Sequence, residues 1–176
     1  MKFLITVCLL VFATTAFAQT RVNPVIKRYG GIFPVPDAVE KPDPNLEYNI
    51  VIEIERASEK PDTLSWALNN VARLLNLHVS GGVPKEKLHV VLAIHGGAAY
   101  TVMNNDAHRS KYGVDNPNLK LYQELSAAGV KIYVCGQSLI ARNIDRTKML
   151  PQVKIATSML TTLTTYQLKG YAPLKF

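Results

Sequence analysis

One cysteine of the chain has a position that could support chemistry. In the stretch GVKIYVCGQSLIARNID, residues 129–145, Cys135 follows an apolar, β-branched run and precedes Gly136, Gln137 and Ser138. If a helix begins there, the unpaired amides of those three residues point toward the sulfur and lower the thiol pKa, which favours the nucleophilic thiolate. The glycine also leaves room for a substrate. A small buried cysteine without a chemical role fits the same position equally well.

A second candidate group is His95, at the end of the apolar stretch KLHVVLAIHGGAAY. This imidazole could orient a thiolate or a bound anion, and Gly96 and Gly97 would let a ligand approach. The simpler interpretation, a histidine satisfied by one backbone carbonyl beside a Gly-Gly turn, is favoured because a neutral imidazole needs only one partner. The GGAA that follows His95 lacks the Gly-x-Gly-x-x-Gly spacing of a nucleotide-binding loop.

Other site chemistries find little support in the sequence. Zinc needs three or four convergent ligands, whereas the four histidines, His78, His89, His95 and His108, lack ligand spacing. Asp106 lies two positions before His108, in a stretch expected to be a loop. No Gly-x-Ser-x-Gly elbow indicates a Ser-His-Asp hydrolase, and no C-x-x-C indicates a dithiol cycle. We therefore expect neither a metal nor another cofactor.

Strand and helix patterns alternate along the chain. Apolar β-branched runs predict strands at 48–54, 87–95, 130–135 and 153–157, and a short edge strand at 171–176 that contains Pro173. Helical spacing predicts a helix capped by Asp62 and stopped at Gly81-Gly82, a helix from Asn116-Pro117 to Gly129, a short helix near Ser138, and a helix over 158–169. The polar stretch 104–115 is expected to be a loop.

This alternation predicts one three-layer α/β domain, with a largely parallel sheet and helices on both faces. Ligands of such sheets bind beyond the carboxyl ends of the strands. Because His95 and Cys135 both lie at strand ends, we expect the site there.

The N-terminus carries the pattern of a secretory signal peptide over residues 1–18. Lys2 precedes an apolar run, and Ala16-Phe17-Ala18 matches an A-x-A cleavage site. Cleavage after Ala18 would export the protein to the periplasm or the medium and remove Cys8, which leaves Cys135 unpaired. An unpaired cysteine indicates a free thiol or a partner chain. No later stretch has the roughly 18 apolar residues of a membrane span.

Residues 19–47 form a Pro-rich N-terminal arm that contains five of the ten prolines. Its apolar side chains predict that it lies over its own domain or over a neighbouring subunit. The formal net charge of the chain is +7, but the basic residues are scattered, so we expect no nucleic-acid partner.

The segment around Cys135, followed by MLPQV and by QLKGYAPLKF, resembles the DsrE/DsrF-like (DsrEFH) family of sulfur-relay proteins over about residues 48–176, and AIHGGAAY resembles the family's His-Gly turn. The resemblance implies a compact parallel domain with flavodoxin-like layering that assembles into trimers or hexamers. It implies that Cys135 carries sulfur as a persulfide and passes it to a thiol of a partner protein. Arg142 matches the family's basic residue, and His95 its strand-end histidine.

Three hypotheses follow for function. The first is an exported persulfide carrier, a sulfurtransferase-like protein with Cys135, His95 and Arg142 as its active groups, and with Gly96, Gly97, Gly136, Gln137 and Ser138 around the substrate. The second is a non-enzymatic oligomeric module that binds a small anion or a partner peptide, with Cys135 buried. The third makes Cys135 an intermolecular disulfide or an oxidation sensor.

Overall fold

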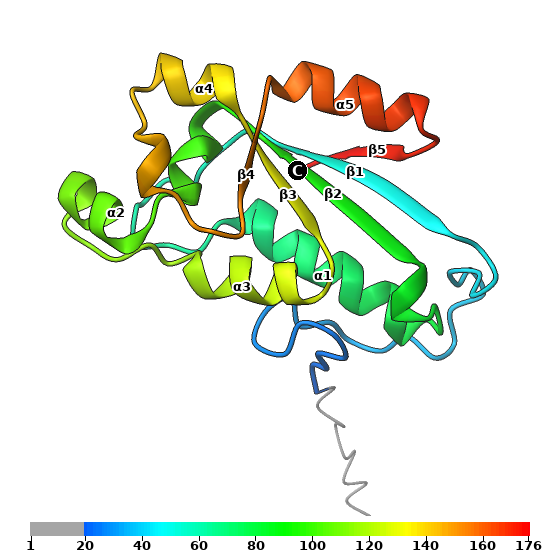
Figure 1. The fold of residues 1–176 in the computed structure, drawn as a ribbon. Helices are drawn as coiled ribbons and strands as arrows, with labels where there is room; N and C mark the ends of the chain where they lie inside the picture. The colour runs from blue at the N-terminus through cyan, green and yellow to red at the C-terminus, as the bar shows by residue number, and fades with distance from the viewer. Residues whose placement is uncertain (1–19) are drawn as a thin grey trace, which may run out of the picture.

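The computed structural model describes residues 20–176, so the signal peptide predicted at 1–18 lies outside the described residues (Figure 1). Five strands form one sheet in the order β4-β3-β2-β1-β5. They are β1 (Tyr48–Ile54), β2 (Leu88–Ile94), β3 (Lys131–Cys135), β4 (Lys154–Ala156) and β5 (Ala172–Lys175). Every pairing between them is parallel. The predicted parallel sheet is confirmed, with β5 as an edge strand.

Helices cover both faces of the sheet, which confirms the α/β class. They are α1 (Trp66–Ser80), α2 (Asn105–Tyr112), α3 (Leu119–Ala127), α4 (Gly136–Ala141) and α5 (Met159–Leu168), with three short 3₁₀ helices, η1 (Lys85–Lys87), η2 (Gly96–Val102) and η3 (Arg146–Lys148). Figure 1 shows α1 and α3 against one face, and α4 and α5 on the other.

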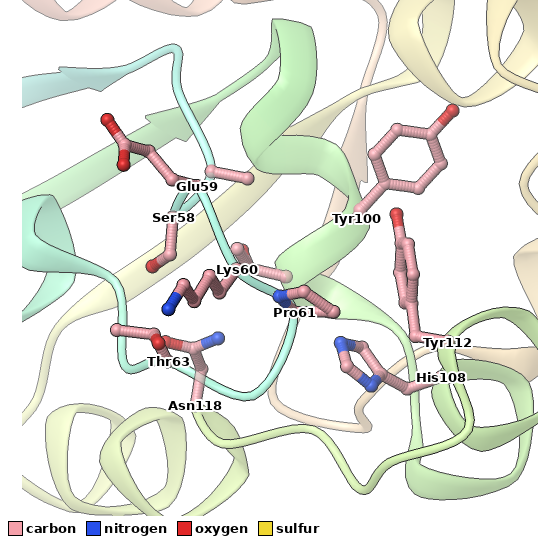
Figure 2. Close-up of a pocket in the computed structure, with 11 residues that line it drawn as sticks. Ser58, Glu59, Lys60, Pro61, Thr63, Tyr100, His108, Tyr112 and Asn118 are labelled. Atoms are coloured by element: carbon pink, nitrogen blue, oxygen red, sulfur yellow. The ribbon is translucent and has the colours of Figure 1, made fainter.

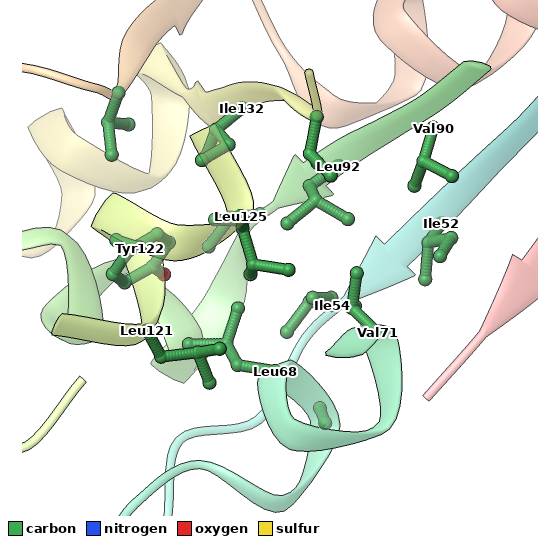
Figure 3. Close-up of a cluster of buried hydrophobic side chains, with 14 of the residues drawn as sticks. Ile52, Ile54, Leu68, Val71, Val90, Leu92, Leu121, Tyr122, Leu125 and Ile132 are labelled. Atoms are coloured by element: carbon green, nitrogen blue, oxygen red, sulfur yellow. The ribbon is translucent and has the colours of Figure 1, made fainter. Parts of the chain in front are cut away.

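The main hydrophobic core lies between the sheet and the pair α1 and α3 (Figure 3). Alternate residues of β1 and β2 point into it, because side chains of a strand alternate between the two faces. Helical spacing places Leu68 and Val71 of α1, and Leu121, Tyr122 and Leu125 of α3, on the facing stripes, and all five are fully buried. This packing holds the carboxyl ends of the strands in fixed positions.

Two local predictions were wrong. Asp62 does not cap α1; the cap is Ser65, whose hydroxyl accepts a hydrogen bond from the Leu68 amide. Residues 104–115 are not a loop but contain α2, which Asn104 caps and Gly113, with φ of 76°, ends. The helix has no apolar stripe, since His108 is its one buried side chain, and periodicity alone could not reveal it.

The arm, in its described part 20–47, lies over α1 of its own domain. Asn76 is fully buried beneath it. Its Oδ1 accepts hydrogen bonds from the amides of Val25 and Ile26, and its Nδ2 donates to the carbonyls of Ile26, Tyr29 and Gly30. One asparagine thus bonds five backbone groups of the arm.

Candidate functional site

The register of the sheet brings His95 and Cys135 to the carboxyl ends of neighbouring strands, on the same face of the sheet. Glu53 of β1 lies opposite Ala93 of β2 and opposite Lys175 of β5, and Ala93 lies opposite Tyr133 of β3. Two residues farther along β2 and β3 come His95 and Cys135, and the alternation of strand side chains places them on the face of Glu53. This is the face covered by α5 (Figure 1).

Cys135 ends β3 and is the N-cap residue of α4. Its exposed fraction is 6%. Burial, the largest single influence, raises the pKa of the thiol, but hydrogen bonding from the Ser138 hydroxyl and from the backbone amides of Met159, Ser138 and Gln137 outweighs it, so the pKa lies below the ordinary cysteine value. Donors aimed at a sulfur stabilise its anion.

The sulfur therefore lies at the start of two helices. Gln137 and Ser138 belong to α4, as the sequence suggested, whereas Met159 is the first residue of α5 and follows 24 positions after Cys135. Ser158 caps α5 by accepting from the Thr161 amide. The sequence shows that α5 exists but not where it begins in space, so this contact was missed.

Gly136 matters because it has no side chain, and its amide is not among the groups that lower the thiol pKa. A Cβ added at this position would lie 2.9 Å from the Ala156 carbonyl oxygen of β4. No side chain fits there unless β3 and β4 separate, so glycine allows the close packing that sets the position of the sulfur.

Ser138 joins the cysteine to the His95 turn. Its Oγ accepts a hydrogen bond of 3.1 Å from the Gly96 amide, and its hydroxyl acts on the Cys135 sulfur. Gly96 has φ of 55°, and a Cβ there would lie 2.8 Å from the Glu55 carbonyl oxygen. Gly97 has no such close contact. The buried Ser138 hydroxyl thus links the Cys135 sulfur to the Gly96 amide.

His95 is held by a carboxylate rather than by the backbone carbonyl that the simpler interpretation expected. Its Nε2 lies 3.0 Å from Glu53 Oε1. Lys175 Nζ lies 2.9 Å from the same oxygen and 3.0 Å from Glu55 Oε2. Burial acts to raise the pKa of Glu53, but hydrogen bonds from Lys175 and His95 lower it below its usual value. The carboxylate therefore stays ionised beside the imidazole.

The residues Glu53, Glu55, His95 and Lys175, which we term the edge cluster, were not anticipated as a unit. The signal available was the acidic pair at alternate positions of YNIVIEIE, directly at a strand end. The ligand atoms of Glu53, Glu55 and His95 lie within 4.8 Å of one another, which suits a metal ion. The Lys175 ammonium already contacts both carboxylates, so an ion would have to displace it.

Arg142 lies elsewhere. It ends α4 and lines a cleft of about 230 Å³ together with Tyr100, Lys111 and Lys148. Of the residues in 20–176, Arg142 is not one of those that shift the pKa of the Cys135 thiol. The structure thus brings together Cys135, Ser138, Gln137, Gly136 and the His95 turn, and places Arg142 in a neighbouring basic cleft.

Among residues 20–176, no helix combines the length and the apolar character needed to cross a bilayer.

Comparison with known proteins agrees with this architecture. A model of the DsrE/DsrF-like family matches residues 42–176. The fold is similar to that of the ychN protein from E. coli, with 22% identity and a TM-score of 0.55, and to that of MTH1491, a protein of unknown function from Methanobacterium thermoautotrophicum, with 17% identity and a TM-score of 0.56. In both cases the match covers 73% of this chain and 99% of the other. A comparison with curated proteins gives no match. Because the family model spans most of the sequence and the two neighbours share its parallel α/β fold, this chain belongs to the DsrE/DsrF-like family.

Proposed function

We propose that this protein is an exported sulfur carrier that holds sulfur as a persulfide on Cys135. The observation that supports the proposal most directly is the lowered thiol pKa, produced by amides from the starts of α4 and α5 and by the Ser138 hydroxyl. Membership in a family of the sulfur-relay type agrees with this chemistry.

The proposed transfer needs only thiol chemistry. The Cys135 thiolate attacks the outer sulfur of a donor persulfide, the donor sulfur–sulfur bond breaks, and the donor leaves as a thiolate. The persulfide anion formed on Cys135 receives hydrogen bonds from the donors that stabilised the thiolate. A partner thiolate then attacks its outer sulfur, and Cys135 leaves as a thiolate again. No metal or redox cofactor enters this sequence.

Neighbouring residues have secondary roles in the proposal. His95, fixed by Glu53, orients the bound sulfur or an anionic donor. Gly96, Gly97, Gly136, Gln137 and Ser138 surround the incoming sulfur. Arg142 lines a basic cleft beside this region, which would attract an anionic donor or partner.

Intact-mass measurement tests the transfer. The chain from Gln19 onward is incubated with a small-molecule persulfide donor, and we expect a gain of about 32 Da, one sulfur atom, that a reductant reverses. The Cys135→Ser variant should gain no mass. A wild-type mass that stays unchanged, like that of the variant, would exclude the carrier.

A second function has one observation in its favour. With 6% exposure, Cys135 has little surface open to a partner, and this favours the binding module in which the cysteine is structural. Alkylation separates the two. A carrier thiol reacts at neutral pH faster than a free cysteine of ordinary pKa, while a structural thiol reacts slowly and shows no lowered pKa.

We also propose that the protein is a homo-oligomer, a trimer or hexamer, that works outside the cytoplasm. Large apolar side chains remain exposed along α4, β4 and α5, namely Ile140, Ile155, Leu160 and Leu168. Such surface is typical of an interface between subunits. Light scattering measures the number of subunits in the assembly. N-terminal sequencing tests export: the secreted or periplasmic protein should begin at Gln19, and retention of residues 1–18 would contradict export.

A further inference from the structure

A polar cavity lies apart from the Cys135 region. Its volume is about 150 Å³, and it lies between the loop after β1, η2 and α2. It is lined by Ala57, Ser58, Glu59, Lys60, Pro61, Thr63, Tyr100, Thr101, His108, Tyr112 and Asn118. It shares Tyr100 with the Arg142 cleft, and none of the residues around Cys135 lines it. A water molecule needs only about 10–15 Å³ of such a cavity. The cavity therefore has room for a small molecule, while drug-sized ligands occupy larger sites.

His108 is the most buried titratable group of this cavity. Its exposed fraction is 4%, and its ring packs beside that of Tyr112, with centroids 4.8 Å apart. Nδ1 lies 2.8 Å from the Val114 carbonyl oxygen. A carbonyl can only accept, so Nδ1 carries the hydrogen, and Nε2 of the neutral ring is an acceptor.

This acceptor has no protein partner within residues 20–176, where Nδ1 makes the one hydrogen bond of the ring. Figure 2 shows the far side of the imidazole directed into the cavity, toward Pro61 and Lys60. Neither the Nδ1 bond nor the packing against Tyr112 uses Nε2. The ring is thus held in place with one acceptor available to a ligand.

The opposite wall offers donors. The Ser58 hydroxyl is buried and has no hydrogen-bond partner among the described residues, which is unusual because buried polar groups are nearly always paired. Lys60 also lines this wall, and Figure 2 shows its ammonium directed toward the side of Ser58 and Thr63, opposite His108, while the Glu59 carboxylate points out of the cavity. The Lys60 charge and the unpaired Ser58 hydroxyl favour an anion.

We propose that this cavity binds a small oxyanion that carries a hydroxyl group. The ligand hydroxyl donates to His108 Nε2, and the anionic oxygens accept from Ser58 and Lys60. Hydrogen phosphate and a short hydroxy acid share this chemistry. The inference stands apart from the proposed sulfur transfer, because none of its groups contacts Cys135.

Titration of the full chain from Gln19 tests the proposal. The histidine ring signals are followed by NMR at neutral pH and constant ionic strength, with inorganic phosphate, glycolate and sulfate as probes. Phosphate, glycolate or both should shift the His108 signals in a saturable manner, while the exposed His89 stays unaffected. Which of the two saturates identifies an inorganic or an organic ligand. Sulfate, which has no hydroxyl hydrogen at this pH, should bind at least about tenfold more weakly.

Surface variants keep the test independent of folding. Lys60→Gln should weaken phosphate or glycolate binding by about threefold to tenfold, since it removes a charged donor. The matched control is Lys85→Gln, an exposed lysine in η1, which should leave the affinity unchanged. The proposal is overturned if no probe saturates below about 10 mM, if sulfate binds as tightly as phosphate and glycolate, or if the two variants behave alike.

Discussion

Replacing Ser138 by alanine removes one of the groups that lower the pKa of the Cys135 thiol and leaves the amides of Gln137, Ser138 and Met159 in place. A hydrogen bond to a charged group contributes about 1.5 kcal/mol or more. Since 1.4 kcal/mol is a factor of ten, the thiolate fraction at a pH below both thiol pKa values falls by about tenfold. The remaining thiolate is more basic, and a Brønsted coefficient of about 0.45 makes it about threefold more nucleophilic. The alkylation rate should therefore fall by about threefold.

The pH profile of that rate carries the decisive information. Iodoacetamide reacts with wild type and Ser138→Ala from about pH 6 to about pH 10, a range that spans the usual cysteine pKa. The variant should be slower at the acidic end and faster at the alkaline end, where both thiols are ionised and its thiolate is the more basic. Ser80→Ala, an exposed serine at the end of α1, should follow wild type. If the ratio of the two rates is the same at every pH, Ser138 controls access to the sulfur and the electrostatic reasoning is refuted.

Three further predictions concern the edge cluster, the arm and the assembly. Lys175 and His95 hold the pKa of Glu53 below its usual value. The stability that this contributes is present above the unfolded-state pKa and is lost as pH falls through the folded-state pKa. Between neutral pH and about pH 3, the free energy of unfolding, measured by urea titration, should therefore fall less in Glu53→Gln than in wild type; an equal fall in both proteins would contradict this. Asn76→Ala should lower the free energy of unfolding by about 2–4 kcal/mol, because it removes five hydrogen bonds to the arm. Asn70 is half-buried on the same helix, and Asn70→Ala should change the free energy of unfolding by about 0.5 kcal/mol or less. Similar losses in both variants would rule out Asn76 as the residue that anchors the arm. Leu168 is 90% exposed on α5 and should lie in the subunit interface. Leu168→Asp should therefore give a monomer in light scattering that is still folded by circular dichroism. An unchanged oligomer would place the interface elsewhere.

Much of the fold was predictable because its signals are local. The β-branched runs at 48–54 and 130–135 and the leucine spacing of α1 depend on residues within one element, and the burial they predict is what the core requires. α2 escaped detection because it buries one side chain, His108. The polar cavity that His108 lines was missed for the same reason.

The site divides along the same physical line. By itself the sequence determined that Cys135 ends a strand and starts a helix, so that the amides of Gln137 and Ser138 reach the sulfur. Only the tertiary structure decided that the start of α5 adds the Met159 amide and that Glu53, itself paired with Lys175, holds His95. The contacts of Gln137 and Ser138 with Cys135 join residues at most three positions apart. The contacts of Met159, Glu53 and Lys175 depend on strand order and register, across as many as 122 residues. Packing and pairing of the whole sheet fix that register, and no local pattern encodes it.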